Sequence, residues 1–276
     1  MNPRRRALLG AAFALPWALA RSPGAGAQSS PGSLSPGAQV PGAPASTVPA
    51  STPPAKISAM RFSALKAGDT LPADLRPWSF AGGQKPTRYS LVEDEGVVVL
   101  RADAAASTSG IARELKLDPR ALPLLSWRWK VLNVVAGGDL RTKAGDDFAA
   151  RVYVTFDLDT ATLSAGERMQ LGMARLVYGD KVPAAALCYV WDGKASRDTS
   201  VPNAYTGRVH MVVAEGGTAR VGQWVGMRRD VRADYRRAFG AEPPAVTGVI
   251  VSTDTDNTGE TAVAFYGDIS FGSRPP

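Results

Sequence analysis

The chain has 276 residues, with 32 lysines and arginines, 25 acidic residues and a formal net charge of +7. Its single histidine and single cysteine exclude histidine-rich zinc sites, four-cysteine zinc sites and intrachain disulfides. It contains no G-x-S-x-G elbow, P-loop or G-x-G-x-x-G fingerprint, so the signatures of α/β-hydrolases, P-loop nucleotidases and dinucleotide-binding enzymes are absent.

The first 27 residues have the features of a secretory signal peptide. Arg4–Arg6 precede an apolar stretch from Ala7 to Ala20, and Ala25–Ala27 offers small residues for cleavage. The apolar stretch is too short to cross a bilayer comfortably, so we expect export by the general secretory or twin-arginine route to the periplasm or beyond. Residues 1–27 carry four arginines, and their removal lowers the charge to +3, which gives no reason to expect nucleic-acid binding.

A low-complexity segment follows the signal peptide. Residues 28–56 are mostly Ser, Pro, Gly and Ala, and such a composition buries too little apolar surface to fold, so we predict a disordered linker. Residues 57–276 are numerous enough for one large domain with its own core. They show no internal repeat and no second linker, and we expect no transmembrane helix in the mature chain.

Most of residues 57–276 alternate between apolar and polar side chains, as strands do when one face lies in a core. Strands are expected at 125–131, 151–156, 187–191, 209–213 and 263–271. The alternation places Trp127 and Trp129 in the core, and it places Met211 on the core side of its strand, opposite the polar His210. Many short strands separated by Gly and Pro turns predict a mainly β protein, a two-sheet β-sandwich or jelly roll.

Two helices are predicted as insertions into this sandwich. The first, Ser164–Tyr178, begins with a capping box and is followed by Gly179, a favourable C-terminal residue. The second, Arg228–Phe239, ends at Gly240 and carries apolar residues at helical spacing. Its arginines are interleaved with aspartates, which favours a solvated face over a surface for anionic lipid or glycan.

An acidic loop near the C-terminus offers oxygen ligands for a hard cation. Asp254, Asp256 and Asn257 stand in the segment DTDNTGE, and Ca²⁺ prefers six to eight such oxygens on a turn relieved by glycine. The alternative is a turn in which Asp and Asn bond to their own backbone. Asp268, on the closing strand, is a further candidate calcium ligand by analogy with sugar-binding jelly rolls.

A second polar cluster surrounds the strand at 151–156. Asp147, Arg151 and Tyr153 share one strand face, and together with Arg128 they would line a polar groove. Trp191 would add an aromatic ring for stacking on a sugar. The alternative is a network of surface ion pairs between Asp and Arg.

Several blocks of the sequence resemble a bacterial family known as domain of unknown function 3047. The blocks are LSWRWKV, GDDFAARVYVTFD, LCYVWDG, GQW…RRDVRADYRRAFG and VSTDTDNTGETAVAFYGDISF, and the resemblance spans Ile57 to Phe271. It implies an exported protein, often of Gram-negative bacteria, with no established activity and no catalytic residues to transfer. The closing blocks are also similar, more distantly, to galactose-binding-like carbohydrate modules.

Three functions follow as hypotheses. The first is binding of a glycan or another cell-envelope polymer on the polar face. The second is a carboxylate-dependent glycosidase or lyase, which would use Asp146 or Asp147 together with Asp254 or Asp256 and needs these groups to face each other. The third is a structural or protein-interaction role. Calcium is the one cofactor that the sequence suggests.

Overall fold

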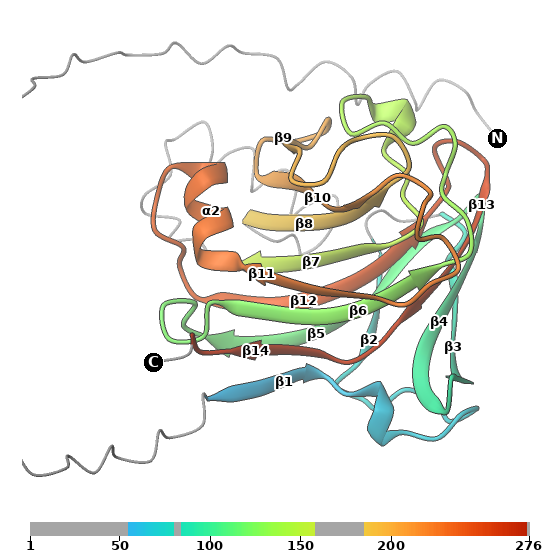
Figure 1. The fold of residues 1–276 in the computed structure, drawn as a ribbon, viewed down its shortest axis with the longest axis horizontal. Coiled ribbons are helices and arrows are strands. Elements are labelled where there is room, and N and C mark those ends of the chain that lie inside the picture. The colour runs from blue at the N-terminus through green and yellow to red at the C-terminus, as the bar shows by residue number, and fades with distance from the viewer. Residues whose placement is uncertain (1–54, 80–83, 158–184, 275–276) are drawn as a thin grey trace, which may run out of the picture. The chain divides into compact units, whose positions relative to one another are not determined.

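The computed structural model describes residues 55–79, 84–157 and 185–274 (Figure 1), which all belong to one compact unit, 53–276. This part of the chain is mainly β and contains two seven-stranded sheets. Sheet A comprises β1 (Lys56–Met60), β3 (Arg88–Asp94), β4 (Val97–Ala105), β6 (Leu124–Val131), β11 (Val225–Asp230), β13 (Thr261–Tyr266) and β14 (Ile269–Gly272). Sheet B comprises β2 (Arg76–Trp78), β5 (Thr108–Leu117), β7 (Arg151–Phe156), β8 (Ala185–Asp192), β9 (Ser200–Pro202), β10 (Val209–Gly216) and β12 (Val246–Asp254).

Sheet A is antiparallel throughout and is organised around β6. One edge of β6 pairs with β11, and the other pairs with β13 and then with β14. Gly267 and Asp268 therefore interrupt what is otherwise one long strand beside β6. Beyond this strand lie β4 next to β13, β1 next to β14, and β3 next to β4.

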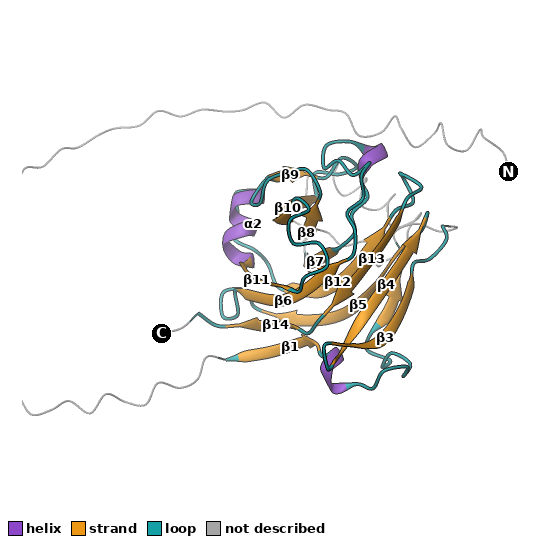
Figure 2. Ribbon diagram, turned by 45° about the vertical axis from the view of Figure 1, so that its right-hand side comes forward, coloured by secondary structure: helices purple, strands orange, loops and turns teal. Residues whose placement is uncertain are grey.

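Sheet B has the order β2-β5-β12-β7-β8-β10-β9. Its neighbours are antiparallel except for β8 and β10, which run parallel. The short strand β9 then forms the far edge by pairing with β10. Figure 2 shows the two sheets and places α2 beside the end of sheet B that β8 and β10 form.

The two sheets share one hydrophobic core. Trp127 and Trp129 of β6 are 4% and 0% exposed, which confirms the side of the strand that the alternation assigned to them. Their indole rings meet sheet B directly, since Trp127 lies 5.3 Å from Tyr189 and Trp129 lies 6.0 Å from Trp191, measured between ring centroids. Aromatic side chains from both sheets thus fill the space between them.

The other face of sheet B carries a second hydrophobic cluster, and here the sequence prediction was wrong. Met211 belongs to this second cluster, whereas Val212 of the same strand faces the core between the sheets. His210, predicted to lie on the polar side, contacts Phe239 of α2 at 6.0 Å between ring centroids. A strand that is buried on both faces is apolar at almost every position, so alternation does not reveal which face meets the main core. Cys188 also lies in the second cluster, where its side chain is fully buried.

The described residues contain one α-helix, α2 (Val231–Phe239), beside two short 3₁₀ turns at Phe62–Ala64 and Lys143–Gly145. The predicted start of this helix was wrong, because β11 continues to Asp230, whose side chain accepts a hydrogen bond from the Ala233 amide and caps the helix. Gly240 ends the helix in a left-handed conformation, as predicted. The other predicted helix, 164–178, lies outside the described residues.

A buried polar network ties α2 to both sheets, to Arg229 of β11 in sheet A and to Tyr189 of β8 in sheet B. Asp234 accepts hydrogen bonds from the Tyr189 hydroxyl at 3.0 Å and from Nε and Nη2 of Arg229, each at 2.9 Å. Tyr189 is fully buried, and the Asp234 side chain is 7% exposed. The opposite side of the helix is solvated, and there Arg232 pairs with Glu242. The inner side of the helix is therefore held by this carboxylate together with the core residues Val231 and Tyr235.

Candidate functional site

The two acidic segments of the sequence meet at one end of sheet B. Asp146 and Asp147 precede β7, and Asp254 is the last residue of the neighbouring strand β12. Carboxylate oxygens of Asp147, Asp254 and Asp256 lie within 4.8 Å of one another. We call this group the loop-end cluster, and its members are Asp146, Asp147, Arg151, Asp254, Asp256 and Asn257.

Arg151 is the centre of the loop-end cluster and is 1% exposed. Its guanidinium makes a bidentate contact with Asp254, in which Nε lies 2.8 Å from Oδ1 and Nη2 lies 2.7 Å from Oδ2. Nη1 donates to Asp146 Oδ1 at 2.9 Å and to the Tyr153 hydroxyl at 3.3 Å, and the Phe148 ring lies 4.7 Å from the guanidinium carbon. The planar fork of arginine suits this role, because it binds one carboxylate at two points and still reaches a second.

Asp147 binds the acidic loop that follows β12 to the segment that precedes β7. Its carboxylate is fully buried and accepts hydrogen bonds from the Thr258 amide at 2.6 Å and from Asn257 Nδ2 at 3.2 Å. Glu260 makes a similar contact from the other side of the loop by accepting from the Gly137 amide at 2.6 Å. These bonds fix residues 257–260 against the segment that leads into β7, so the cluster is preorganised.

The cluster contains four carboxylates but only one guanidinium, that of Arg151. Burial raises the pKa of Asp254 to about 7, although the charge of Arg151 acts in the opposite direction. Burial also raises the pKa of Asp256, and the nearby charge of Asp147 adds to this effect. The cluster therefore has an excess of negative charge that favours either a bound proton or a cation.

Asp254 is expected to titrate near pH 7 in the folded protein, whereas an aspartate in the unfolded chain titrates near ~3.9. The folded chain thus binds this proton more tightly. The contribution of Asp254 to the free energy of unfolding is greatest below about pH 4 and declines as the pH rises to about 7. The pKa of Asp254 can be measured from the change of its carboxyl ¹³C chemical shift with pH. Asp118 is the control, because its hydrogen bond with Arg120 lowers the pKa. A midpoint for Asp254 as low as that of Asp118 would contradict the prediction.

The outer part of the cluster is accessible to solvent. Tyr205 is 42% exposed and is the most exposed aromatic residue in the described ranges. Its hydroxyl lies 3.0 Å from the Lys143 carbonyl oxygen and 3.1 Å from Asn257 Oδ1. Asn203 donates to Asp146 Oδ2 at 3.0 Å. Planar polar side chains thus surround an exposed aromatic ring.

The structure brings together most of the residues that the sequence singled out. Those that meet in or beside the loop-end cluster are Asp147, Arg151, Tyr153, Asp254, Asp256 and Asn257. Arg128 lies on sheet A instead, and Trp191 is 1% exposed in the main core, where its indole donates to the Gly217 carbonyl at 3.1 Å. Asp268 lies at the interruption between β13 and β14 and accepts hydrogen bonds from Ser63.

Sequence reasoning missed three residues of the site. Asn203 and Tyr205 lie in the connection between β9 and β10, and Gln84, which precedes β3, donates to Asp256 Oδ2 at 2.9 Å. These residues carry no periodic pattern, because they belong to loops. Only the fold brings their side chains to the acidic cluster.

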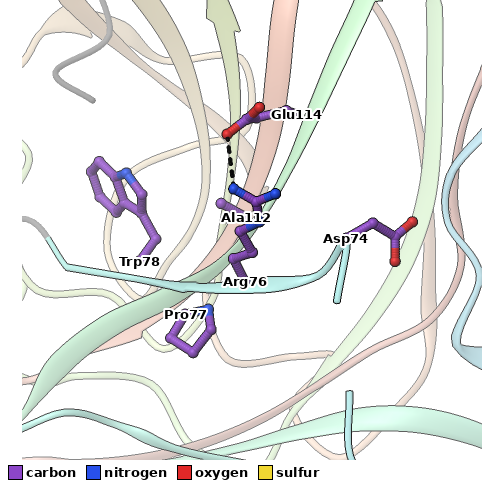
Figure 3. Close-up of a pocket in the computed structure, with 6 residues that line it drawn as sticks. All are labelled: Asp74, Arg76, Pro77, Trp78, Ala112 and Glu114. Carbon is purple, nitrogen blue, oxygen red and sulfur yellow. Dashed lines mark ion pairs between the residues drawn. The ribbon is translucent and has the colours of Figure 1, made fainter. Parts of the chain in front are cut away.

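A shallow pocket opens elsewhere on sheet B, at its β2 edge (Figure 3). Its lining residues are Asp74, Arg76, Pro77, Trp78, Ala112 and Glu114. The ion pair across it is long and exposed, with Arg76 Nη1 3.8 Å from Glu114 Oε1. None of the residues predicted from the sequence lines this pocket, so it is a poorer candidate site than the loop-end cluster.

In the described ranges, no helix combines the length and the apolar character needed to cross a bilayer. No curated protein matches the chain. Among solved structures, the chain is similar to a family 30 carbohydrate-binding module of a cellulosomal cellulase of Clostridium thermocellum, with 12% identity and a TM-score of 0.39 over 80% of this chain and 99% of the module. The family model described as "Protein of unknown function (DUF3047)" matches residues 73–270. Since this match covers well over half of the sequence, the chain belongs to the DUF3047 family.

Proposed function

We propose that this protein is an exported domain of the mainly β, jelly-roll type that binds a glycan of the cell envelope or its surroundings at the loop-end cluster. The observation that carries the proposal is the exposed ring of Tyr205. It lies beside amide and carboxylate groups that the buried residues of the cluster hold in place. Ligand sites combine apolar surface with a few fixed polar groups that set orientation. A sugar ring offers the matching surfaces, an apolar face of C–H groups and a rim of hydroxyls.

The buried part of the cluster supports this site without touching the ligand. Arg151 fixes Asp146, and Asp147 fixes the loop that carries Asn257. Because these groups are already ordered, a ligand loses little binding energy to side-chain ordering. The sugar hydroxyls would meet Asn203, Asn257 and Asp256, which are partly exposed.

The burial of Asp147 and Asp254 favours binding over catalysis at this pair. The glycosidase or lyase hypothesis requires facing carboxylates, and the structure does bring Asp147 and Asp254 together. Both side chains are buried, however, at 0% and 5% exposure, and both are bound by groups of the protein itself. A substrate would have to displace these bonds to reach them. The glycan-binding proposal instead uses Asn203, Asn257 and Asp256, which are more exposed than these two carboxylates.

Thermal unfolding of the full chain with millimolar oligosaccharides tests the proposal, with chitohexaose, cellohexaose, xylohexaose and peptidoglycan fragments as probes. A ligand present at 100 times its Kd adds about 2.7 kcal/mol of stability, which raises Tm by several degrees. We expect such a shift to disappear in Tyr205→Ala, where the ring is lost, and to persist in Tyr205→Phe, where the ring remains.

The matched control is Ile57→Ala, which truncates a side chain of similar exposure, 44%, on β1. Its shift should equal that of the wild type. A shift that survives Tyr205→Ala would move the site away from the loop end, and no shift with any probe would refute glycan binding. The same melts with calcium and with a chelator test the calcium prediction. A shift with calcium alone, lost in Asp256→Asn, would assign the loop to a structural cation.

A further inference from the structure

Sheet A carries a row of cations on the face turned away from the core. We call this row the cationic strip, and its members are Arg88, Arg101, Arg128, Lys130 and Arg228. In the strand register, Lys130 of β6 is opposite Phe265 of β13, which is opposite Arg101 of β4. Neighbouring residues in register point to the same side of a sheet, with strands about 4.8 Å apart. The strip therefore crosses the sheet from β11 to β3.

Aromatic rings hold the cations of the strip in place. The guanidinium carbon of Arg128 lies 4.5 Å from the centre of the Trp224 ring, and Lys130 Nζ lies between Trp224 at 5.3 Å and Phe265 at 4.9 Å. Arg101 lies 5.6 Å from the Phe265 ring on its other side. Alternating rings and cations attract each other, so Arg101, Arg128 and Lys130 are held in place before any ligand arrives.

The strip has more positive charge than its counter-ions neutralise. Asp103 binds Arg101 at 2.7 Å and lies 3.5 Å from Arg88, whose side chain is 77% exposed. Asp94 pairs with Lys130 and accepts from the Trp224 indole at 3.1 Å. Within the described ranges, neither Arg128 nor Arg228 has a carboxylate partner. Five cations therefore face two carboxylates.

We infer that the cationic strip binds an anionic polysaccharide, one that carries sulfate or carboxylate groups along an extended chain. Guanidinium forks match both groups, and their linear spacing across the strands suits a linear polymer. Arg101, Arg128 and Lys130 stack against the rings of Trp224 and Phe265, so they present their charges in fixed positions to a polymer that carries anionic groups at intervals. The strip shares no residue with the loop-end cluster, so the inference stands independently of the proposed function.

Binding of the full chain to dextran sulfate and to polygalacturonate tests the inference, with uncharged dextran as the neutral control. We expect binding that weakens as salt is added, because screening reduces the attraction. The triple variant Arg88→Gln/Arg128→Gln/Arg228→Gln should bind at least tenfold more weakly. Its Tm should stay close to that of the wild type, because these side chains are on the surface. The single variant Arg228→Gln gives a smaller loss and serves as the test if the triple variant is unstable.

The matched control removes three arginines from the solvated side of α2, as Arg232→Gln/Arg236→Gln/Arg237→Gln. It changes the net charge equally and should leave binding within twofold of the wild type. An equal loss in the α2 control would show that only net charge matters, and stronger binding to phosphatidylglycerol vesicles than to the polysaccharides would assign the strip to a lipid surface. Either result, or full binding by the strip variant, would overturn the inference.

Discussion

Replacing Arg151 by methionine is expected to lower the free energy of unfolding by about 3–5 kcal/mol, the range measured when one partner of a buried ion pair is removed. The guanidinium is 1% exposed and binds both Asp146 and Asp254. Without it, four carboxylates would remain close together in a site with little water. Urea unfolding followed by circular dichroism at pH 7.5 measures the loss.

Two further variants separate charge from packing in this prediction. Arg120→Met removes an arginine from an exposed pair with Asp118 and should cost much less than Arg151→Met. The double variant Arg151→Met/Asp254→Asn removes one of the stranded charges, so it should be more stable than Arg151→Met alone. If Arg151→Met cost no more than Arg120→Met, Arg151 would not be the counter-charge on which the cluster depends.

Replacing Asp234 by alanine is expected to cost a similar amount, about 3–5 kcal/mol, at the opposite end of sheet B. This carboxylate is the buried partner of Arg229 and of the Tyr189 hydroxyl, and its loss leaves Arg229 paired only with the more exposed Asp198 and leaves Tyr189 without this acceptor. Because this contact holds the inner side of α2, amide hydrogen exchange should accelerate in residues 231–239 more than in the sheets. Urea unfolding and hydrogen exchange measure the two effects.

Glu242→Ala is the matched control for this second prediction. Glu242 pairs with Arg232 and Arg236 on the solvated side of the same helix, where ion pairs contribute little to stability. In the Glu242→Ala variant, the amide exchange rates of α2 should change little. Equal destabilisation by the two variants would mean that the buried network does not anchor the helix.

The sequence predicts sheet A well because its strands have one core face and one exposed face. In β6 the tryptophans alternate with Arg128 and Lys130, and the structure follows this pattern. Sheet B is different near its β9 edge, because β8 and β10 are buried on both sides and are apolar at nearly every position. Periodicity therefore identified these strands but not the direction of Met211 or His210. Their parallel pairing depends on contacts that no local pattern records.

The candidate site was predictable in its chemistry but not in its assembly. Runs of aspartate beside glycine marked both acidic segments, yet Asp147 and Asp254 are far apart in sequence and meet only because β7 pairs with β12. Arg128 and Arg151 occupy similar positions in alternating strands, but one belongs to sheet A and the other to sheet B. Strand order decides which polar faces combine, and strand order depends on long-range pairing.

Hydrogen–deuterium exchange of the full chain, with and without each oligosaccharide of the panel, is the most direct test of glycan binding at the loop-end cluster. A bound sugar would cover Tyr205 and Asn257, so exchange should slow in peptides that span 202–209 and 254–260. The same peptides in Tyr205→Ala should show no slowing. Protection confined to other segments, or no protection with any probe, would contradict the account.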